Sequence, residues 1–362
     1  NSCRIMIEIQ LLDEKREDDY EEVFSSSPHY LVYQSLKYRD FLKAVLSNSE
    51  DKYLIAYEDG TPVGVLPTFV KKNDQFGPVV NSLPFFGSNG GVMVHAEASN
   101  PAEVKRRLLG GFRDLVDEQD AVASTIISNP LQPDEDVYAE HSGYTHTDER
   151  IGQVVDLSTF QSESSDYIAE ELLATYHRYV RRNIRKALKS NIQVSKSYSD
   201  NNLHALARIH WNNMEAIGGH CKPWFVLDAI REHFEYGRDW RLYTGWHDGT
   251  AVGGLIVLYG SKTVEYYIPA TDHDYRSLQP TSLLIWHAMT EAIQAGYKFW
   301  NWGGTWLTQG GVYNFKSRWG TQDYPYHYYI CIRKPSILKQ SKTTVLDAYP
   351  HYYVCPFSKL EQ

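Results

Sequence analysis

The chain of 362 residues is long for one domain, and its 42% hydrophobic and 22% charged residues are typical of a globular protein. The formal net charge of -9 argues against nucleic-acid binding, DNA included, through the overall field. No apolar run approaches the roughly 20 residues that a membrane-spanning helix needs. The four cysteines lack C-x-x-C spacing, so neither a zinc site nor a disulfide framework is indicated, and we expect no metal and a reducing, cytoplasmic setting.

The first half of the chain predicts a helix, a hairpin, a second helix and a further strand. The hairpin turn is Asp59-Gly60, a strong two-residue signal. A loop at residues 83–91 has the composition of a binding loop or of a plain turn between strands. The predicted elements are a helix at 36–46, strands at 53–57 and 62–71, a helix at 101–118 and a strand at 121–127.

The second half predicts the same elements in the same order. Its hairpin turn is Asp248-Gly249, and its last helix begins with Pro280 and ends at Gly296, which is favourable start and stop chemistry. The predicted elements are a helix at 224–236, strands at 241–246, 251–259 and 263–270, a helix at 280–295 and a short strand at 299–302.

The two hairpins share a sequence. Residues 59–64 read DGTPVG and residues 248–253 read DGTAVG, which agree at five of six positions. Because element order and spacing agree as well, a duplication is indicated. We therefore predict an α/β (α+β) fold with two tandem domains, at 1–155 and 156–334, each a mixed, mostly antiparallel sheet flanked by helices. The aromatic tail at 335–362 is predicted to dock back onto the first domain.

A basic segment opens the second domain after a serine-rich linker at 158–165. Residues 169–190 have the periodicity of one long helix, and no acidic residue occurs from Leu172 to Tyr198. Such a charge run is either a solvated helix face or an anion site for a pyrophosphate or an RNA backbone. The candidate ligands of donor phosphates are Arg181, Arg182 and Arg185.

One lysine stands out near the end of the second domain. Two glycine turns bracket residues 311–320, and Lys316 lies in the middle of this apolar, aromatic run beside Phe315. A desolvated lysine next to glycine-rich backbone is able to approach a substrate oxygen and stabilise charge there. The alternative is the end of a surface strand, with a lysine that merely extends to water.

This arrangement resembles the GNAT acyltransferase fold, and two such units with an arginine-rich helix resemble the Fem family of peptidoglycan-bridge aminoacyltransferases and the wider FemAB-like group. The residues that carry the resemblance are Arg181-Arg182-Asn183-Ile184-Arg185-Lys186-Ala187, Gln279-Pro280-Thr281-Ser282-Leu283-Leu284, residues 296–304, Phe315-Lys316 with Trp319-Gly320, and, in the first half, residues 63–67 and 83–87.

The resemblance implies a role for each candidate site residue. Lys316 would stabilise the negative charge that develops as an amine attacks an acyl carbonyl, and the backbone carbonyl of Phe315 would take part in proton transfer from that amine. Strand alternation lets only one of Tyr266 and Tyr267 face the cleft. The further substrate-binding candidates are Trp302, Gly303, Gly304 and Thr305 on the floor, the two tyrosines on the wall, and Arg276, Arg318 and Asn89.

The sequence departs from the GNAT pattern where coenzyme A phosphates usually bind. Pro280 stands where glycines normally present backbone N–H groups, although Arg276 and the helix start are able to hold an anion. Residues 89–95 lack the acidic residue expected for a muramyl-peptide nucleotide. The resemblance implies no tightly bound cofactor and an aminoacyl-tRNA or acyl-CoA donor.

The implied acceptor is an amine of a cell-envelope precursor, of peptidoglycan or polysaccharide, with membrane contact at most peripheral through a lipid-linked acceptor. Two other functions remain open from sequence. One is an acyl-CoA-dependent amino-sugar N-acyltransferase, and the other is a GNAT-like binding module without catalysis.

Overall fold

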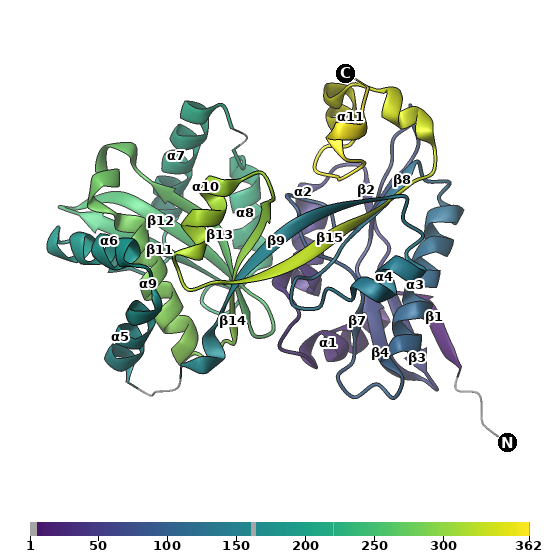
Figure 1. Ribbon diagram of the computed structural model, residues 1–362, viewed down its shortest axis with the longest axis horizontal. Helices are drawn as coiled ribbons and strands as arrows, with labels where there is room; N and C mark the ends of the chain where they lie inside the picture. Colours follow the sequence, from purple (N-terminus) through teal and green to yellow (C-terminus); the bar gives the residue numbers. More distant parts are fainter. Residues whose placement is uncertain (1–5, 161–163, 220, 362) are drawn as a thin grey trace. The chain divides into compact units, whose positions relative to one another are not determined.

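The computed structural model describes residues 6–160, 164–219 and 221–361 (Figure 1). The chain forms two compact units, of which unit 1 comprises Asn1–Ile151 with Pro325–Gln362 and unit 2 comprises Gly152–Tyr324. Strands β9 (His146–Asp156) and β15 (Gln322–Ile332) each contain a unit boundary. Cys3 and residues 161–163 of the predicted serine-rich linker lie outside the described residues.

Unit 1 contains two sets of paired strands. One has the order β1-β3-β4-β7 and is antiparallel throughout, while the other runs β15-β8-β6-β5-β2 with only β6 and β8 parallel. The bounds are β1 (Ile7–Leu11), α1 (Glu17–Ser25), α2 (Leu36–Val45), β2 (Ser49–Asp51), β3 (Leu54–Glu58), β4 (Thr61–Leu66), β5 (Phe69–Lys71), β6 (Val79–Ser82), β7 (Met93–Val94), α3 (Pro101–Glu118), β8 (Ala123–Ile127), α4 (Glu135–His141) and α11 (Lys342–Ala348).

The core of unit 1 lies where α3 packs on the first of these sheets. Val104, Leu108 and Phe112 of α3 are buried in one cluster with strand residues. A Cβ at Gly64 would lie 2.5 Å from Val104 and one at Gly111 would lie 2.8 Å from Ile9, so these glycines permit the close approach of helix and sheet. The tail packs within this unit, since the Tyr349 hydroxyl donates to the Gly77 carbonyl.

Unit 2 has a sheet with the order β10-β11-β12-β13-β14, and β9 follows β14. Only the β13–β14 pair among the first five strands is parallel. The bounds are α5 (Ser165–Thr175), α6 (Arg178–Lys189), β10 (Gln193–Ser195), α7 (Asp200–Ile217), α8 (Trp224–His233), β11 (Trp240–His247), β12 (Thr250–Tyr259), β13 (Thr263–Thr271), α9 (Pro280–Gln294), β14 (Phe299–Trp306) and α10 (Gly310–Ser317). Short 3-10 turns occur at Glu14–Arg16, Val32–Gln34, Leu157–Thr159, His273–Leu278, Pro335–Lys339 and Phe357–Lys359.

Helices cover both faces of the unit 2 sheet. Two adjacent glycines of β12 point to opposite faces, as strand geometry requires. A Cβ at Gly253 would lie 3.3 Å from Pro280 of α9, and a Cβ at Gly254 would lie 2.6 Å from Leu206 of α7. The absence of side chains at these two positions therefore lets α9 approach one face and α7 the other. Helices α5 and α6 share the buried cluster of α9.

The predicted fold class and both predicted hairpin turns are confirmed. The class is α/β, with mostly antiparallel sheets flanked by helices. Asp59 and Gly60 have φ values of 50° and 81°, and Asp248 and Gly249 have 47° and 79°. Positive φ at both central residues is the condition for the type I′ turn that suits a twisted hairpin.

Several predicted elements differ from the structure. The predicted strand at 62–71 is two strands, β4 and β5. They belong to different sheets because Pro67 and Thr68 interrupt the strand. The predicted long helix at 169–190 is interrupted at Tyr176 and His177, where Tyr176 takes extended backbone angles and the His177 side chain caps α6. Helices α7 and α10 were not predicted. In the described part of the chain, no helix is both long and apolar enough to cross a bilayer.

Candidate functional site

Strands β13 and β14 separate part-way along their length. They pair in parallel from Thr263–Phe299 to Glu265–Asn301, and among the described residues no further pair joins them although both strands continue. At the last pair the Asn301 side chain donates to the buried Glu265 carboxylate at 3.1 Å. Tyr266, the first residue of β13 beyond this last pair, lines the pocket described next.

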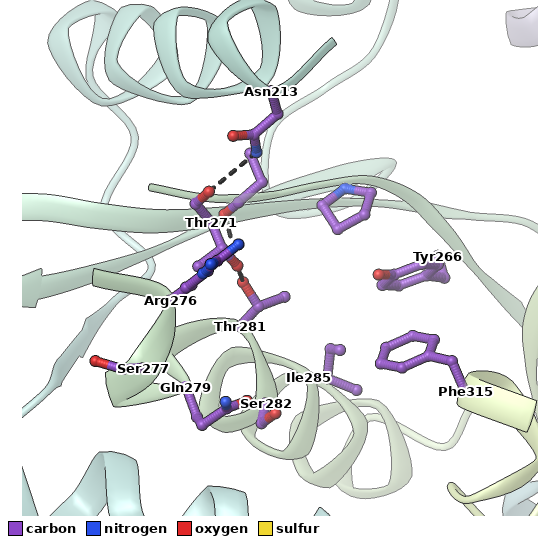
Figure 2. Close-up of a pocket in the computed structure, with 12 residues that line it drawn as sticks. Asn213, Tyr266, Thr271, Arg276, Ser277, Gln279, Thr281, Ser282, Ile285 and Phe315 are labelled. Carbon is purple, nitrogen blue, oxygen red and sulfur yellow. Dashed lines mark hydrogen bonds between the residues drawn. The ribbon is translucent and has the colours of Figure 1, made fainter. Parts of the chain in front are cut away.

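A pocket of about 570 Å³ lies beside the divergent part of β13 (Figure 2). At one end are the rings of Tyr266 and Phe315, with Ile285 of α9 next to them. At the other end are Arg276 and Gln279. The remaining lining residues are Asn213, Pro269, Ala270, Thr271, Ser277, Thr281 and Ser282. The pocket is therefore aromatic at one end and polar at the other.

The polar end contains the start of α9. Pro280 occupies the first turn and has no N–H, whereas Thr281 and Ser282 bring hydroxyls and backbone N–H groups to the pocket wall. The Thr281 hydroxyl is bonded to the Thr271 hydroxyl, and the Asn213 amide donates to the Thr271 carbonyl at 3.0 Å. Together with Arg276, this end suits an anionic group.

Helix α10 places Phe315 and Lys316 at the aromatic end. The segment was predicted as two glycine turns around an aromatic run, with a surface strand end as the alternative, but Gly310–Ser317 forms a helix and Trp319 follows directly after it. Phe315 is 43% exposed and lines the pocket, while Trp319 is fully buried. The Phe315 ring makes edge contacts with Trp302 and Trp319, with ring centroids at 5.9 Å and 6.4 Å.

Lys316 is a buried cation held by oxygen atoms. Its side chain is only 8% exposed, and its Nζ donates to the Thr305 hydroxyl at 3.0 Å and more loosely to the Gly303 and Gly304 carbonyls at 3.4 Å each. Among the described residues no carboxylate forms an ion pair with it. Burial lowers the pKa of Lys316 to about 8, so the ammonium form predominates near pH 7 but is readily lost above that.

The structure brings most of the predicted floor residues to Lys316 rather than to the pocket lining. Gly303, with φ of 81°, and Gly304 provide carbonyls, and Thr305 provides its hydroxyl. Trp302 is 2% exposed and packs against Tyr266 with ring centroids 4.6 Å apart. Gly303, Gly304 and Thr305 therefore hold Lys316 in place, and Trp302 supports the pocket wall by packing against Tyr266.

Of the two predicted wall tyrosines, Tyr266 lines the pocket. Tyr267 is absent from the lining and lies under Lys222, whose Nζ is 5.2 Å from the ring centroid. Burial also lowers the pKa of Lys222 to about 8. Asn89 belongs to unit 1, where its buried amide donates to the Ser128 carbonyl, which is a structural use of that side chain.

The predicted phosphate ligands lie on one helix. Arg182 and Arg185 are exposed on α6 and Arg181 is half-buried. The guanidinium groups of Arg182 and Arg318 both contact the Tyr179 ring, at 4.6 Å and 5.0 Å from its centroid. Helix α6 begins next to the end of α10, because the His177 N–H donates to the Arg318 carbonyl at 2.8 Å. The basic helix and the lysine-bearing helix are thus joined.

Sequence reasoning missed residues of this region that lie far from it in the chain. Asn213 of α7 lines the pocket, and Gln153 of β9 is fully buried and hydrogen-bonded to Thr305. Both lie far in sequence from residues 301–320, and neither occurs in a motif. The three-residue spacing of Asn213 from the buried His210 on one helix face was the available signal for an inward-facing polar side chain.

A comparison with protein-family models matches residues 174–317 to the acetyltransferase (GNAT) domain. This segment of unit 2 therefore resembles a GNAT domain. The divergent strands β13 and β14, the pocket and Lys316 all fall within or directly against this matched segment. A comparison with curated proteins finds no match.

Solved structures with a similar fold cover nearly the whole chain. FemX has a TM-score of 0.70 and 15% identity over 91% of this chain and 98% of its own. A tandem GNAT protein from the clavulanic acid biosynthesis pathway has a TM-score of 0.53 and 12% identity over 90% and 98%. The C-terminal domain of a putative lysylphosphatidylglycerol synthetase from Agrobacterium fabrum has a TM-score of 0.56 and 10% identity, over 94% of this chain and 99% of its own. The predicted likeness to tandem GNAT proteins of the FemX type is confirmed for the fold.

Proposed function

We propose that this protein is an N-acyltransferase that moves an acyl or aminoacyl group onto an amine of a cell-envelope precursor by direct attack. The observation that carries the proposal is Lys316, a buried cation without an ion-pair partner among the described residues, beside a pocket in a GNAT domain. Burying a charge is costly. A site that keeps a buried cation without an ion-pair partner is therefore a candidate for stabilising negative charge on a bound substrate.

The attack forms a carbon–nitrogen bond and breaks the bond between the acyl carbon and the donor oxygen or sulfur. Negative charge develops on the carbonyl oxygen. Lys316 would stabilise it by giving up one of its 3.4 Å contacts with a backbone carbonyl and donating a hydrogen bond to the oxyanion instead. The attacking amine must lose a proton, which ends on the departing oxygen or sulfur of the donor, and the Phe315 carbonyl would accept a hydrogen bond from the amine during this transfer. The Phe315 carbonyl lies in the last turn of α10, and the Trp319 N–H, which would reach it in a continuing helix, donates to the Lys316 carbonyl instead.

The pocket suggests where the donor lies. An acyl group would contact Tyr266 and Phe315 at the aromatic end, and an anionic part of the donor or acceptor would contact Arg276 and the start of α9. Further phosphates would lie on α6, where Arg181, Arg182 and Arg185 were predicted to bind them. The junction between α6 and α10 supports this placement, because the His177 N–H donates to the Arg318 carbonyl two residues after Lys316.

The acceptor and donor classes rest on likeness of fold. FemX and a putative lysylphosphatidylglycerol synthetase, which is named for an aminoacylated phospholipid, share the fold and support an envelope-related acceptor. An acyl-CoA-dependent amino-sugar acyltransferase is the second candidate, because the polar end of the pocket combines Arg276 with the start of α9. Pro280 weighs against it, since it removes one N–H from that anion site.

Mass spectrometry of products tests the proposal. The protein is incubated with an amine acceptor pool from cell-envelope precursors and either acyl-CoA species or charged tRNA. The expected result is a mass increase on the acceptor by one acyl or aminoacyl group. Activity that disappears after ribonuclease treatment of the donor assigns the tRNA version, and activity that survives assigns the acyl-CoA version. No product with either donor would contradict the proposal.

The lowered pKa of Lys316 predicts a pH dependence. Because the ammonium form stabilises the oxyanion, kcat/KM should fall about tenfold per pH unit above pH 8, where Lys316 loses its proton. An acceptor amine whose own pKa is below about 7 keeps its deprotonation out of this range. A Lys316→Arg variant stays protonated and should lose the decline. A wild-type decline that begins only near the ordinary lysine pKa would contradict this assignment.

A further inference from the structure

Gln153 of β9 is a buried amide whose two ends are both used. It has no exposed surface, its Nε2 donates to the Tyr313 carbonyl of α10 at 3.1 Å, and its Oε1 accepts from the Thr305 hydroxyl at 3.1 Å. A backbone carbonyl is only able to accept a hydrogen bond. The amide must therefore turn its NH₂ group to Tyr313 and its oxygen to Thr305.

This orientation determines the direction of the next hydrogen bond. The Thr305 hydroxyl has a single hydrogen, and that hydrogen is given to Gln153. Thr305 is fully buried, and its remaining lone pairs face the Lys316 Nζ at 3.0 Å. Lys316 must then be the donor in that contact. Its other two contacts, the Gly303 and Gly304 carbonyls, are also acceptors.

We propose that Gln153 is a positioning residue that acts through Thr305 to hold Lys316 as a hydrogen-bond donor aimed at the acyl oxygen. This inference rests on the proposed function, in which Lys316 stabilises the oxyanion. Gln153 also ties β9 to α10 through Tyr313, which keeps the lysine-bearing helix at a set distance from the strand. Without the amide, the Thr305 hydroxyl is free to rotate and donate to a neutral Lys316 or to a nearby carbonyl.

The test combines two variants at the ends of one hydrogen bond. Gln153→Met keeps the side-chain length but neither hydrogen bond, and Thr305→Val keeps the shape but not the hydroxyl. Each is expected to lower kcat about tenfold with KM changed less than about twofold, and to move the high-pH decline of kcat/KM to lower pH. The double variant should lose little more than either single one, because both remove the same chain of hydrogen bonds. Thr305→Ser retains the hydroxyl and should keep the high-pH decline of kcat/KM at its wild-type position.

A matched control is Gln34→Met in unit 1. Gln34 is also fully buried, and its amide donates to the Gly90 carbonyl and accepts from the Leu31 N–H. The control should lose stability comparably in urea titration without any movement of the pH decline. If Gln153→Met behaves like this control, Gln153 is merely structural and the inference is wrong.

A second readout does not depend on turnover. The rate at which acetic anhydride acylates the Lys316 amine, followed by peptide mass spectrometry across pH, reports its pKa directly. We expect a lower pKa in Gln153→Met than in the wild type, and an unchanged value would overturn the inference. If Lys316→Ala retained full activity, the proposed function of Lys316 would fall instead, and the labelling would still measure whether Gln153 controls the lysine.

Discussion

Replacing Lys316 by alanine is expected to lower kcat by about 10²–10³-fold, the usual loss when one oxyanion-stabilising donor is removed from a dry site. The reason is local. Lys316 is the buried cation next to the pocket, and its contacts are a firm one to Thr305 and two loose ones to backbone carbonyls. Alanine removes the charge but leaves Phe315 and the pocket wall in place. Steady-state kinetics with the donor identified by mass spectrometry measures the effect.

The same variant separates an enzyme from a binding module. Calorimetric binding of coenzyme A and of tRNA should change less than about threefold in Lys316→Ala, since the lysine would act mainly in the transition state. Lys262→Ala is the matched control because Lys262 is an exposed lysine of unit 2. The control should retain full kcat. Unchanged turnover in Lys316→Ala would contradict the catalytic assignment. Ligand binding that is retained in Lys316→Ala, with no measurable turnover in the wild type, would favour a binding module.

Local signals in the sequence were sufficient where a single residue type determines the backbone. Helix α3 has the bounds predicted from its proline start, and α9 ends one residue before its predicted limit at the turn that Gly296 closes. The hairpin turns required positive φ at Asp59-Gly60 and Asp248-Gly249, which these residues adopt at low cost. The order of such elements was enough to predict the class of fold.

The remaining features depend on tertiary contacts that no local pattern encodes. Helix α10 begins with two glycines and has no side-chain cap, so its propensity is low, and its stability comes from burying Trp319 against Tyr176 and Trp302. Gln153 precedes Thr305 by more than 150 positions. The two residues meet because β9 and β14 are adjacent strands of one sheet. Lys316 and its oxygen partners Gly303, Gly304 and Thr305 were all selected from sequence, but the three partners were predicted to bind substrate and their contact with Lys316 was not predicted.

The stability of the site should depend most on Trp319. It is fully buried at the end of α10, with ring centroids 4.9 Å from Tyr176, 5.3 Å from Trp302 and 6.4 Å from Phe315. Trp319→Ala is therefore expected to lower the free energy of unfolding by about 3–5 kcal/mol, through lost burial and the cavity that remains. Urea titration followed by circular dichroism measures this. Trp319→Phe should cost less than about 2 kcal/mol, because it keeps an aromatic ring and removes an indole N–H that has no partner among the described residues.

Trp240→Ala distinguishes loss of stability from loss of the site. Trp240 is similarly buried in unit 2, but its ring packs on Tyr198 and Tyr236, and neither of these tyrosines lines the pocket. Both variants should lose similar stability. In the folded fraction, assayed well below the denaturation midpoint, only Trp319→Ala should also lose kcat, because the helix that carries Phe315 and Lys316 is no longer anchored at its end. Equal kcat losses in the two variants would show that Trp319 supports the fold of unit 2 in general rather than the position of α10.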